Sequence, residues 1–166
     1  TYNLMADVDN NIPKIDTVYK NRYAVIFGNE DYKTYQDVGS EANVDFAAAD
    51  AIVFRRYAEN VLGIPDENMQ FKVNARKRDM VRMINKIKEL AKLSDHPAEI
   101  FFYYAGHGFP DEKTKEAYIM PVDITGAEVR DGIKLADMYR DFSTAENVEK
   151  VVGFIDACFS GGGRAE

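Results

Sequence analysis

The chain has 166 residues, of which 46% are hydrophobic and 30% charged, and its formal net charge is −7. This length and composition are typical of one globular domain with a hydrophobic core. The acidic balance argues against nucleic acid and against an anionic membrane surface as partners. No apolar run is long enough to span a membrane, and no signal segment is visible within the chain. We therefore expect a soluble domain, whose compartment the sequence leaves unknown.

Two regions are predicted: residues 1–21, polar and unpatterned, form an extended N-terminal arm, and residues 22–166 form the domain. Short apolar runs predict strands, and apolar residues spaced three and four apart predict helices. In chain order we predict a strand at 23–27, a helix from about 43 to 62, a strand at 69–73, a helix at 77–93, a strand at 100–104, a short strand at 118–120, a helix at 135–142 and a strand at 151–155.

This alternation predicts an α/β fold in which a mostly parallel sheet has helices on both faces. Ligands of such sheets bind at the carboxyl ends of the strands. The strand predicted at 151–155 lies close to the end of the sequence, although a buried parallel strand normally has neighbours on both sides. We therefore expect further C-terminal strands that this chain does not contain.

Two motifs follow predicted strands at 103–108 and 156–163, reading YYAGHG and DACFSGGG. They contain His107, one of two histidines, and Cys158, the only cysteine, 51 residues later. A thiol and an imidazole at one edge of a sheet form the reactive pair of a cysteine hydrolase. The backbone N–H groups of Gly108 and Cys158 are candidates for an oxyanion hole.

Each of these residues also has a structural interpretation. A lone cysteine is often a small buried hydrophobe, and a histidine beside glycine is often a turn residue. His96 precedes a proline in a polar loop, and we assign it no function. Asp156 projects to the same side as Cys158, where it would either attract a cationic substrate or brace the loop. Asp50 lies near the start of a helix, where it would also compensate the helix dipole.

The segments 23–32, 48–51, 103–108 and 156–161 together resemble the caspase-like cysteine peptidases, in the metacaspase and prokaryotic caspase-homologue branch. The resemblance extends over 22–163 and corresponds to the large-subunit portion of those enzymes. It implies a three-layer caspase-like fold.

The resemblance also implies a cysteine endopeptidase with a His107–Cys158 dyad and an oxyanion hole near Gly108 and Cys158. Asp156 and Asp50 match two acids that line the primary specificity pocket (S1) in the metacaspase branch. Caspases have glutamine at the first of these positions and cleave after aspartate. Two carboxylates attract a cation, so we expect cleavage of a peptide or protein substrate after Arg or Lys.

Some features of the family are absent from the sequence. We expect the small C-terminal subunit, or a segment of the same precursor, as a partner, and self-cleavage at Arg164. Metacaspases often bind calcium through acids between the two motifs. Here lysines interrupt the acids at 111–116, and Arg130 interrupts those that follow. We therefore expect no metal and no cofactor, with calcium activation as the alternative. Ala47 and Ala105 stand where relatives often carry Cys and Ser.

Two other classes of protein remain as alternatives. A catalytically silent caspase-like scaffold or binding module would share the fold, because fold alone does not fix function. A phospho-receiver domain also places an aspartate at a strand end. That class explains neither His107 nor the glycine-rich turns.

Overall fold

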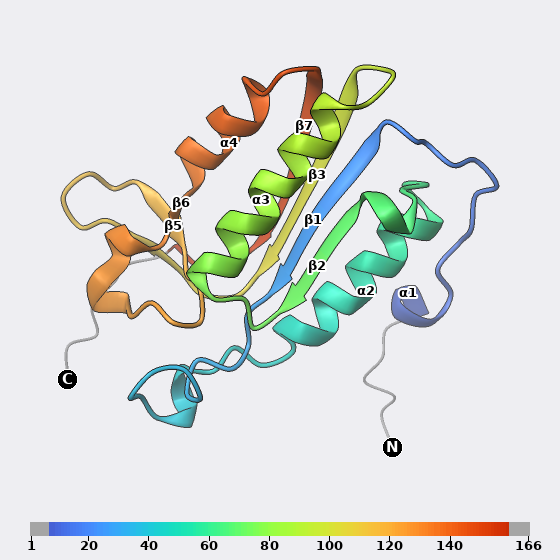
Figure 1. Ribbon diagram of the computed structural model, residues 1–166. Helices are drawn as coiled ribbons and strands as arrows, with labels where there is room; N and C mark the ends of the chain where they lie inside the picture. Colours follow the sequence, from blue (N-terminus) through green and yellow to red (C-terminus); the bar gives the residue numbers. More distant parts are fainter. Residues whose placement is uncertain (1–6, 160–166) are drawn as a thin grey trace.

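A four-stranded parallel sheet forms the centre of the computed structural model, which describes residues 7–159 (Figure 1). The strand order is β2-β1-β3-β7. The bounds are β1 Arg22–Gly28, β2 Met69–Val73, β3 Ala98–Ala105 and β7 Val148–Asp156. The predicted parallel sheet is thus confirmed, with each strand lying where an apolar run predicted it.

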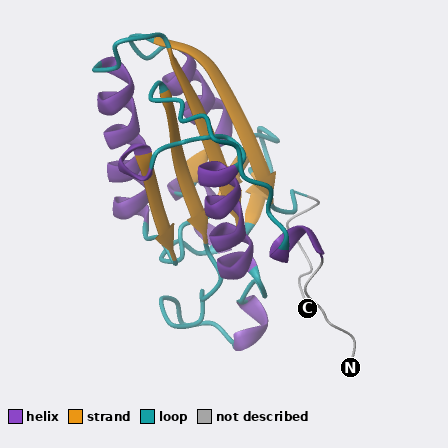
Figure 2. Ribbon diagram, turned by 90° about the vertical axis from the view of Figure 1, so that its right-hand side faces the viewer, coloured by secondary structure: helices purple, strands orange, loops and turns teal. Residues whose placement is uncertain are grey.

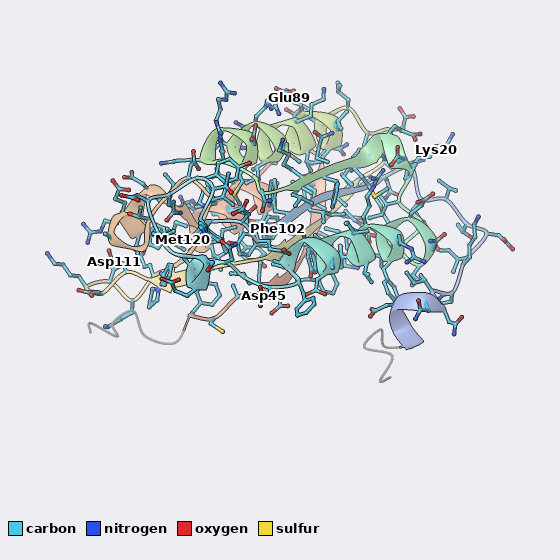
Figure 3. The ribbon with its side chains drawn as sticks, turned by 90° about the horizontal axis from the view of Figure 1, so that it is seen from below. Lys20, Asp45, Glu89, Phe102, Asp111 and Met120 are labelled. Carbon is cyan, nitrogen blue, oxygen red and sulfur yellow. The ribbon has the colours of Figure 1, made fainter. Side chains whose placement is uncertain are left out.

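Helices cover both faces of this sheet, which gives the predicted three layers (Figure 2). Successive residues of a strand point to opposite faces. On β1, Val25 and Phe27 pack toward α3 (Lys77–Lys92) and α4 (Leu135–Ser143), whereas Ala24 and Ile26 pack toward α2 (Ala47–Asn60). Because both faces are covered, residues 23–27 of β1 are buried and apolar without alternation. Figure 3 shows α3 and α2 on opposite sides of the sheet, with Phe102 between them.

A second, antiparallel sheet has the strand order β4-β5-β6. Its strands are β4 Gly108–Pro110, β5 Ala117–Ile119 and β6 Ile133–Lys134. Only β5 corresponds to a predicted strand, because two or three residues are too few to give a periodic signal. Since β4 begins directly after His107, this small sheet fixes the backbone next to that histidine.

Within residues 7–159, the short helices lie in the N-terminal arm and in the connections between the longer elements. Residues 1–21 were predicted to be extended, but α1 forms one helical turn there. The backbone N–H of Ile15 donates to the Asn60 carbonyl at 2.9 Å, so the arm runs along the end of α2. The short helices are α1 Asp7–Asn10, η1 Ser40–Ala42, η2 Asp66–Asn68 and η3 Gly126–Asp131.

The start of α2 differs from the prediction, which placed it near Asn43. The helix begins at Ala47, and Phe46 before it has a left-handed backbone with φ of 70°. The Asn43 side chain instead accepts the backbone N–H groups of Tyr32 and Lys33, both at 3.0 Å. Asn43 therefore braces the loop after β1, a role that side-chain periodicity does not reveal.

Strand β7 is an edge strand among residues 7–159, since it pairs with β3 alone. Its side chains are half-buried or exposed, and Phe154 is 41% exposed. None of the helices in the described part of the chain is long and apolar enough to cross a membrane.

Candidate active site

Parallel pairing of β3 with β7 brings the two sequence motifs together. The register places Ala105 opposite Asp156, and the Gly106 N–H donates to the Asp156 carbonyl at 3.2 Å. A Cβ atom built on Gly108 would lie 2.5 Å from the Phe159 ring. The residues on both sides of Cys158 therefore contact residues beside His107. Gly106 has φ of 152°, a conformation that favours glycine at this turn.

The imidazole of His107 has a defined hydrogen bond. Its Nε2 lies 2.7 Å from the carbonyl oxygen of Ala42. Because a carbonyl only accepts hydrogen bonds, Nε2 carries the proton of this bond. In the neutral ring Nδ1 is then the acceptor nitrogen, as a general base requires.

Two aromatic rings hold the His107 ring, which is half-buried. The centroid of the Tyr32 ring lies 4.5 Å away, and that of Phe109 lies 5.6 Å away in a stacked geometry. Ala42, Tyr32 and Phe109 were not predicted as site residues. Ala42 acts through its backbone, so its side chain gives no signal. Phe109 follows the motif directly and was within reach of sequence reasoning.

The thiol of Cys158 is free and exposed. Its neighbours Ala157 and Phe159 pack against the core beneath α3 and α4. Asp156, at the end of β7, is exposed. An exposed thiol between two packed neighbours is accessible to a substrate while its backbone is fixed on both sides.

Asp50 and Asp156 lie close enough to interact, together with Tyr103. Burial raises the pKa of Asp50, and the charge of Asp156 raises it further. Burial, and then the charges of Asp50 and Asp156, raise the pKa of Tyr103. Three polar groups from α2, β3 and β7 are therefore close enough to affect one another's charge. Tyr103 was not predicted as a site residue, although it belongs to the motif at 103–108.

A shallow cavity of about 220 Å³ adjoins this group. The Tyr103 ring stacks on Phe54, with centroids 4.3 Å apart. A carboxylate and aromatic rings in one cavity suit a cationic side chain, through charge and through cation–π contact. The residues that line the cavity are Asp50, Val53, Phe54, Tyr57 and Tyr103.

The N–H of Gly108, the candidate oxyanion donor, points away from the second sheet. Met120 donates its N–H to the His107 carbonyl, and Gly108 lies opposite Ile119. In an antiparallel ladder, hydrogen-bonded pairs alternate with pairs that are not hydrogen-bonded. His107 and Met120 occupy a hydrogen-bonded position, so Gly108 and Ile119 form the next, non-hydrogen-bonded pair. The Gly108 N–H is therefore not used by β5.

Two of the acids between the motifs, Asp111 and Glu116, are paired with cations. Arg130 Nε donates to Asp111 at 2.6 Å, and the Thr114 N–H donates to the same carboxylate at 2.8 Å. The hydrogen bond from Arg130 is the main cause that lowers the pKa of Asp111. Glu116 pairs with Lys134. Within the part of the chain that the structure describes, no three His, Cys, Asp or Glu residues gather as metal ligands would.

Comparison with known proteins agrees with this architecture. The sequence model of the caspase domain family matches residues 21–166, so the chain belongs to the caspase-like family of cysteine peptidases. The crystal structure of protein GSU0716 from Geobacter sulfurreducens is similar in fold, with a TM-score of 0.60 and 19% identity. The match covers 86% of this chain but 52% of that one, so this chain spans about half of its length. No curated protein matches the sequence.

Proposed function

We propose that this protein is a cysteine endopeptidase that hydrolyses peptide bonds after Arg or Lys, with Cys158 as nucleophile and His107 as general base and acid. The main support is the pairing of β3 with β7, which joins the flanks of both motifs at one edge of the sheet. The bond from His107 Nε2 to Ala42 adds support, because it leaves Nδ1 free to accept a proton.

The proposed reaction has two steps. Nδ1 of His107 takes the thiol proton while the sulfur attacks the substrate carbonyl carbon, and the carbonyl electron pair moves to oxygen. The N–H groups of Gly108 and Cys158 stabilise that oxyanion. As the C–N bond breaks, His107 gives its proton to the leaving amine, which leaves a thioester. Water then attacks the thioester, giving one proton to His107, and the acid product leaves as the thiol forms again.

The proposed specificity rests on Asp50 and Asp156. Both are exposed, and each lies in the electric field of the other. Two carboxylates repel an acidic side chain and attract a guanidinium or ammonium group. A guanidinium has five donors in a planar fork, so it can bond both carboxylates together.

The proposed partner is a C-terminal segment of the same precursor, paired with the free edge of β7. The exposure of Phe154 on this edge strand supports that pairing. Arg164, the proposed self-cleavage position, lies outside the described residues. Mass spectrometry of the precursor tests self-cleavage: we expect a cut after Arg164, and an intact Arg164–Ala165 bond in the active enzyme would contradict it.

Cys158→Ala tests the proposed function. We expect loss of Arg-reporter cleavage by more than about 10⁴-fold, as for removal of a catalytic nucleophile, with an unchanged circular dichroism spectrum. Asp156→Asn, as the companion variant, should lose its preference for Arg while Cys158 still reacts with iodoacetamide. Undiminished turnover by Cys158→Ala would refute the peptidase. Faster cleavage after Asp than after Arg by the unmodified protein would refute the pocket.

A further inference from the structure

The ladder between β4 and β5 is interrupted beside His107. Met120 donates its N–H to the His107 carbonyl at 3.0 Å. In a regular ladder the His107 N–H would return a bond to the Met120 carbonyl. Instead, it donates to the hydroxyl oxygen of Tyr32 at 3.0 Å, and that hydroxyl donates to the Met120 carbonyl, also at 3.0 Å. The Tyr32 hydroxyl is thus inserted where one ladder bond would be.

A second tyrosine completes the arrangement. The hydroxyl of Tyr104 donates to the His107 carbonyl at 2.7 Å and accepts the Met120 N–H at 3.2 Å. Each hydroxyl has one hydrogen, and this assignment uses both while satisfying all four backbone groups. Hydroxyls of two tyrosines therefore contact both backbone polar groups of His107.

Both tyrosines are buried, with Tyr32 2% exposed and Tyr104 fully buried. Burial raises the pKa of Tyr32 to about 12 and that of Tyr104 well above its ordinary value. Both remain phenols near neutral pH, so each keeps the hydrogen that it donates. Tyr32 comes from the loop after β1, and Tyr104 lies on β3. Segments distant in the sequence therefore converge on the backbone of His107.

We propose that Tyr32 is a positioning residue for His107. Its hydroxyl lies between the His107 N–H and the Met120 carbonyl, keeps these two backbone groups apart, and so directs the imidazole toward Cys158. This inference rests on the proposed role of His107 as general base.

Without the hydroxyl, the His107 N–H would either bond directly to the Met120 carbonyl, which moves His107 toward β5, or stay unpaired. The Met120 carbonyl would keep its bond from the Asn29 side chain. A shift of His107 toward β5 would move its ring away from Ala42, which fixes its Nε2 proton.

Tyr32→Phe keeps the ring and removes the hydroxyl, and Tyr118→Phe is the matched control. Tyr118 is buried together with Tyr32 in one hydrophobic cluster, and it makes no hydrogen bond to His107 among the described residues. We expect Tyr32→Phe to lower kcat about 10- to 100-fold, as a small misplacement of a catalytic group does, with the KM for an Arg reporter within twofold. Tyr104→Phe should lower kcat less, because the His107 carbonyl keeps its bond from Met120.

Nitrogen NMR of the imidazoles gives a readout that does not need turnover. The chain has two histidines, so His96 serves as the internal reference. We expect His107 protonated on Nε2 in the unmodified protein and a mixture of tautomers in Tyr32→Phe, with His96 unchanged. An unmodified protein that cuts nothing, but whose His107 signal shifts in Tyr32→Phe, would refute the peptidase and support the positioning role. A Tyr32→Phe variant with control-like kcat, or with an unchanged His107 signal, would overturn the positioning role.

Discussion

The loops that carry His107 and Cys158 lie side by side but are held very differently. The backbone of His107 contacts two buried tyrosine hydroxyls, and its ring contacts Ala42, Tyr32 and Phe109. Cys158 follows an edge strand, is exposed, and makes no side-chain hydrogen bond within residues 7–159.

This difference indicates that the two proposed catalytic residues are positioned in different ways. The orientation of the general base is set by the core of this chain, because the groups that hold it are buried. The nucleophile is positioned mainly through the packing of Ala157 and Phe159. Substitution of the buried residues that hold His107 should therefore lower both the stability of the fold and the activity. Substitution of residues around Cys158 should lower the activity alone.

After Cys158→Ala, the largest effect is expected for His107→Ala. Loss of the general base should lower kcat/KM for an Arg reporter about 10²- to 10⁴-fold, while the melting temperature changes little because the ring is half-exposed. His96→Ala is the control and should retain full activity, since His96 lies in the loop before β3. An equal loss of kcat/KM in both variants would contradict the proposed role of His107 as general base.

Asn29→Ala should have the next largest effect, and on stability. Asn29 is buried; its amide oxygen accepts the Ala75 N–H at 2.8 Å, and its amide nitrogen donates to the Met120 carbonyl at 3.0 Å. Removing the amide leaves the buried Ala75 N–H unpaired and takes one bond from the Met120 carbonyl, and should lower the free energy of unfolding by about 2–3 kcal/mol. Asp156→Asn, on the Cys158 side, should stay within about 0.5 kcal/mol. Urea denaturation measures both, and equal costs would contradict the contrast between the loops.

Gly108→Ala tests the contact between the two loops. The added Cβ would lie within 3 Å of the Phe159 ring, so the ring, and the segment with Cys158, must move. We expect kcat to fall about tenfold through misplacement of the nucleophile, with little change in stability. Phe159→Leu in the same background should recover part of the activity. Full activity of Gly108→Ala would mean that the loops do not depend on each other.

The smallest effect concerns the pH dependence of substrate binding. Burial and the nearby Asp156 charge raise the pKa of Asp50. As the pH falls, Asp50 takes up a proton before an ordinary carboxyl does, so the KM for an Arg reporter should rise a few-fold. Asp50→Asn should abolish that part of the profile. An identical KM profile in both proteins would exclude Asp50 from the pocket.

The same shift predicts a small change in stability. A carboxyl whose pKa is higher in the folded state disfavours folding while it is ionised, and this penalty disappears as the pH falls through the folded-state value. Asp50→Asn should therefore be slightly more stable near neutral pH, by at most about 0.5 kcal/mol because the group is largely exposed. A clear loss of stability would contradict the assigned shift.

The sheet and its helices were predictable because a continuous apolar run specifies β1 and a helical spacing of apolar residues specifies α3. The second sheet was not predictable, since β4 and β6 are too short for a period. The two motifs predicted which loops meet, because parallel strands share a carboxyl edge. Ala42, acting through its carbonyl, and Tyr32, acting through contacts 75 residues away, give no local signal. Such contacts arise only from the tertiary structure.

The proximity of residues 107 and 158 can be measured directly, because Cys158 is the only cysteine. His107→Cys adds a second thiol, and a short bifunctional thiol reagent then reports whether the two side chains face each other. His96→Cys is the control, since His96 lies at the opposite end of β3, where Asn147 donates to its carbonyl. We predict an intramolecular link between positions 107 and 158, seen as a peptide pair by mass spectrometry, and none between 96 and 158. Absence of the 107–158 link in the folded protein would contradict the proposed active site.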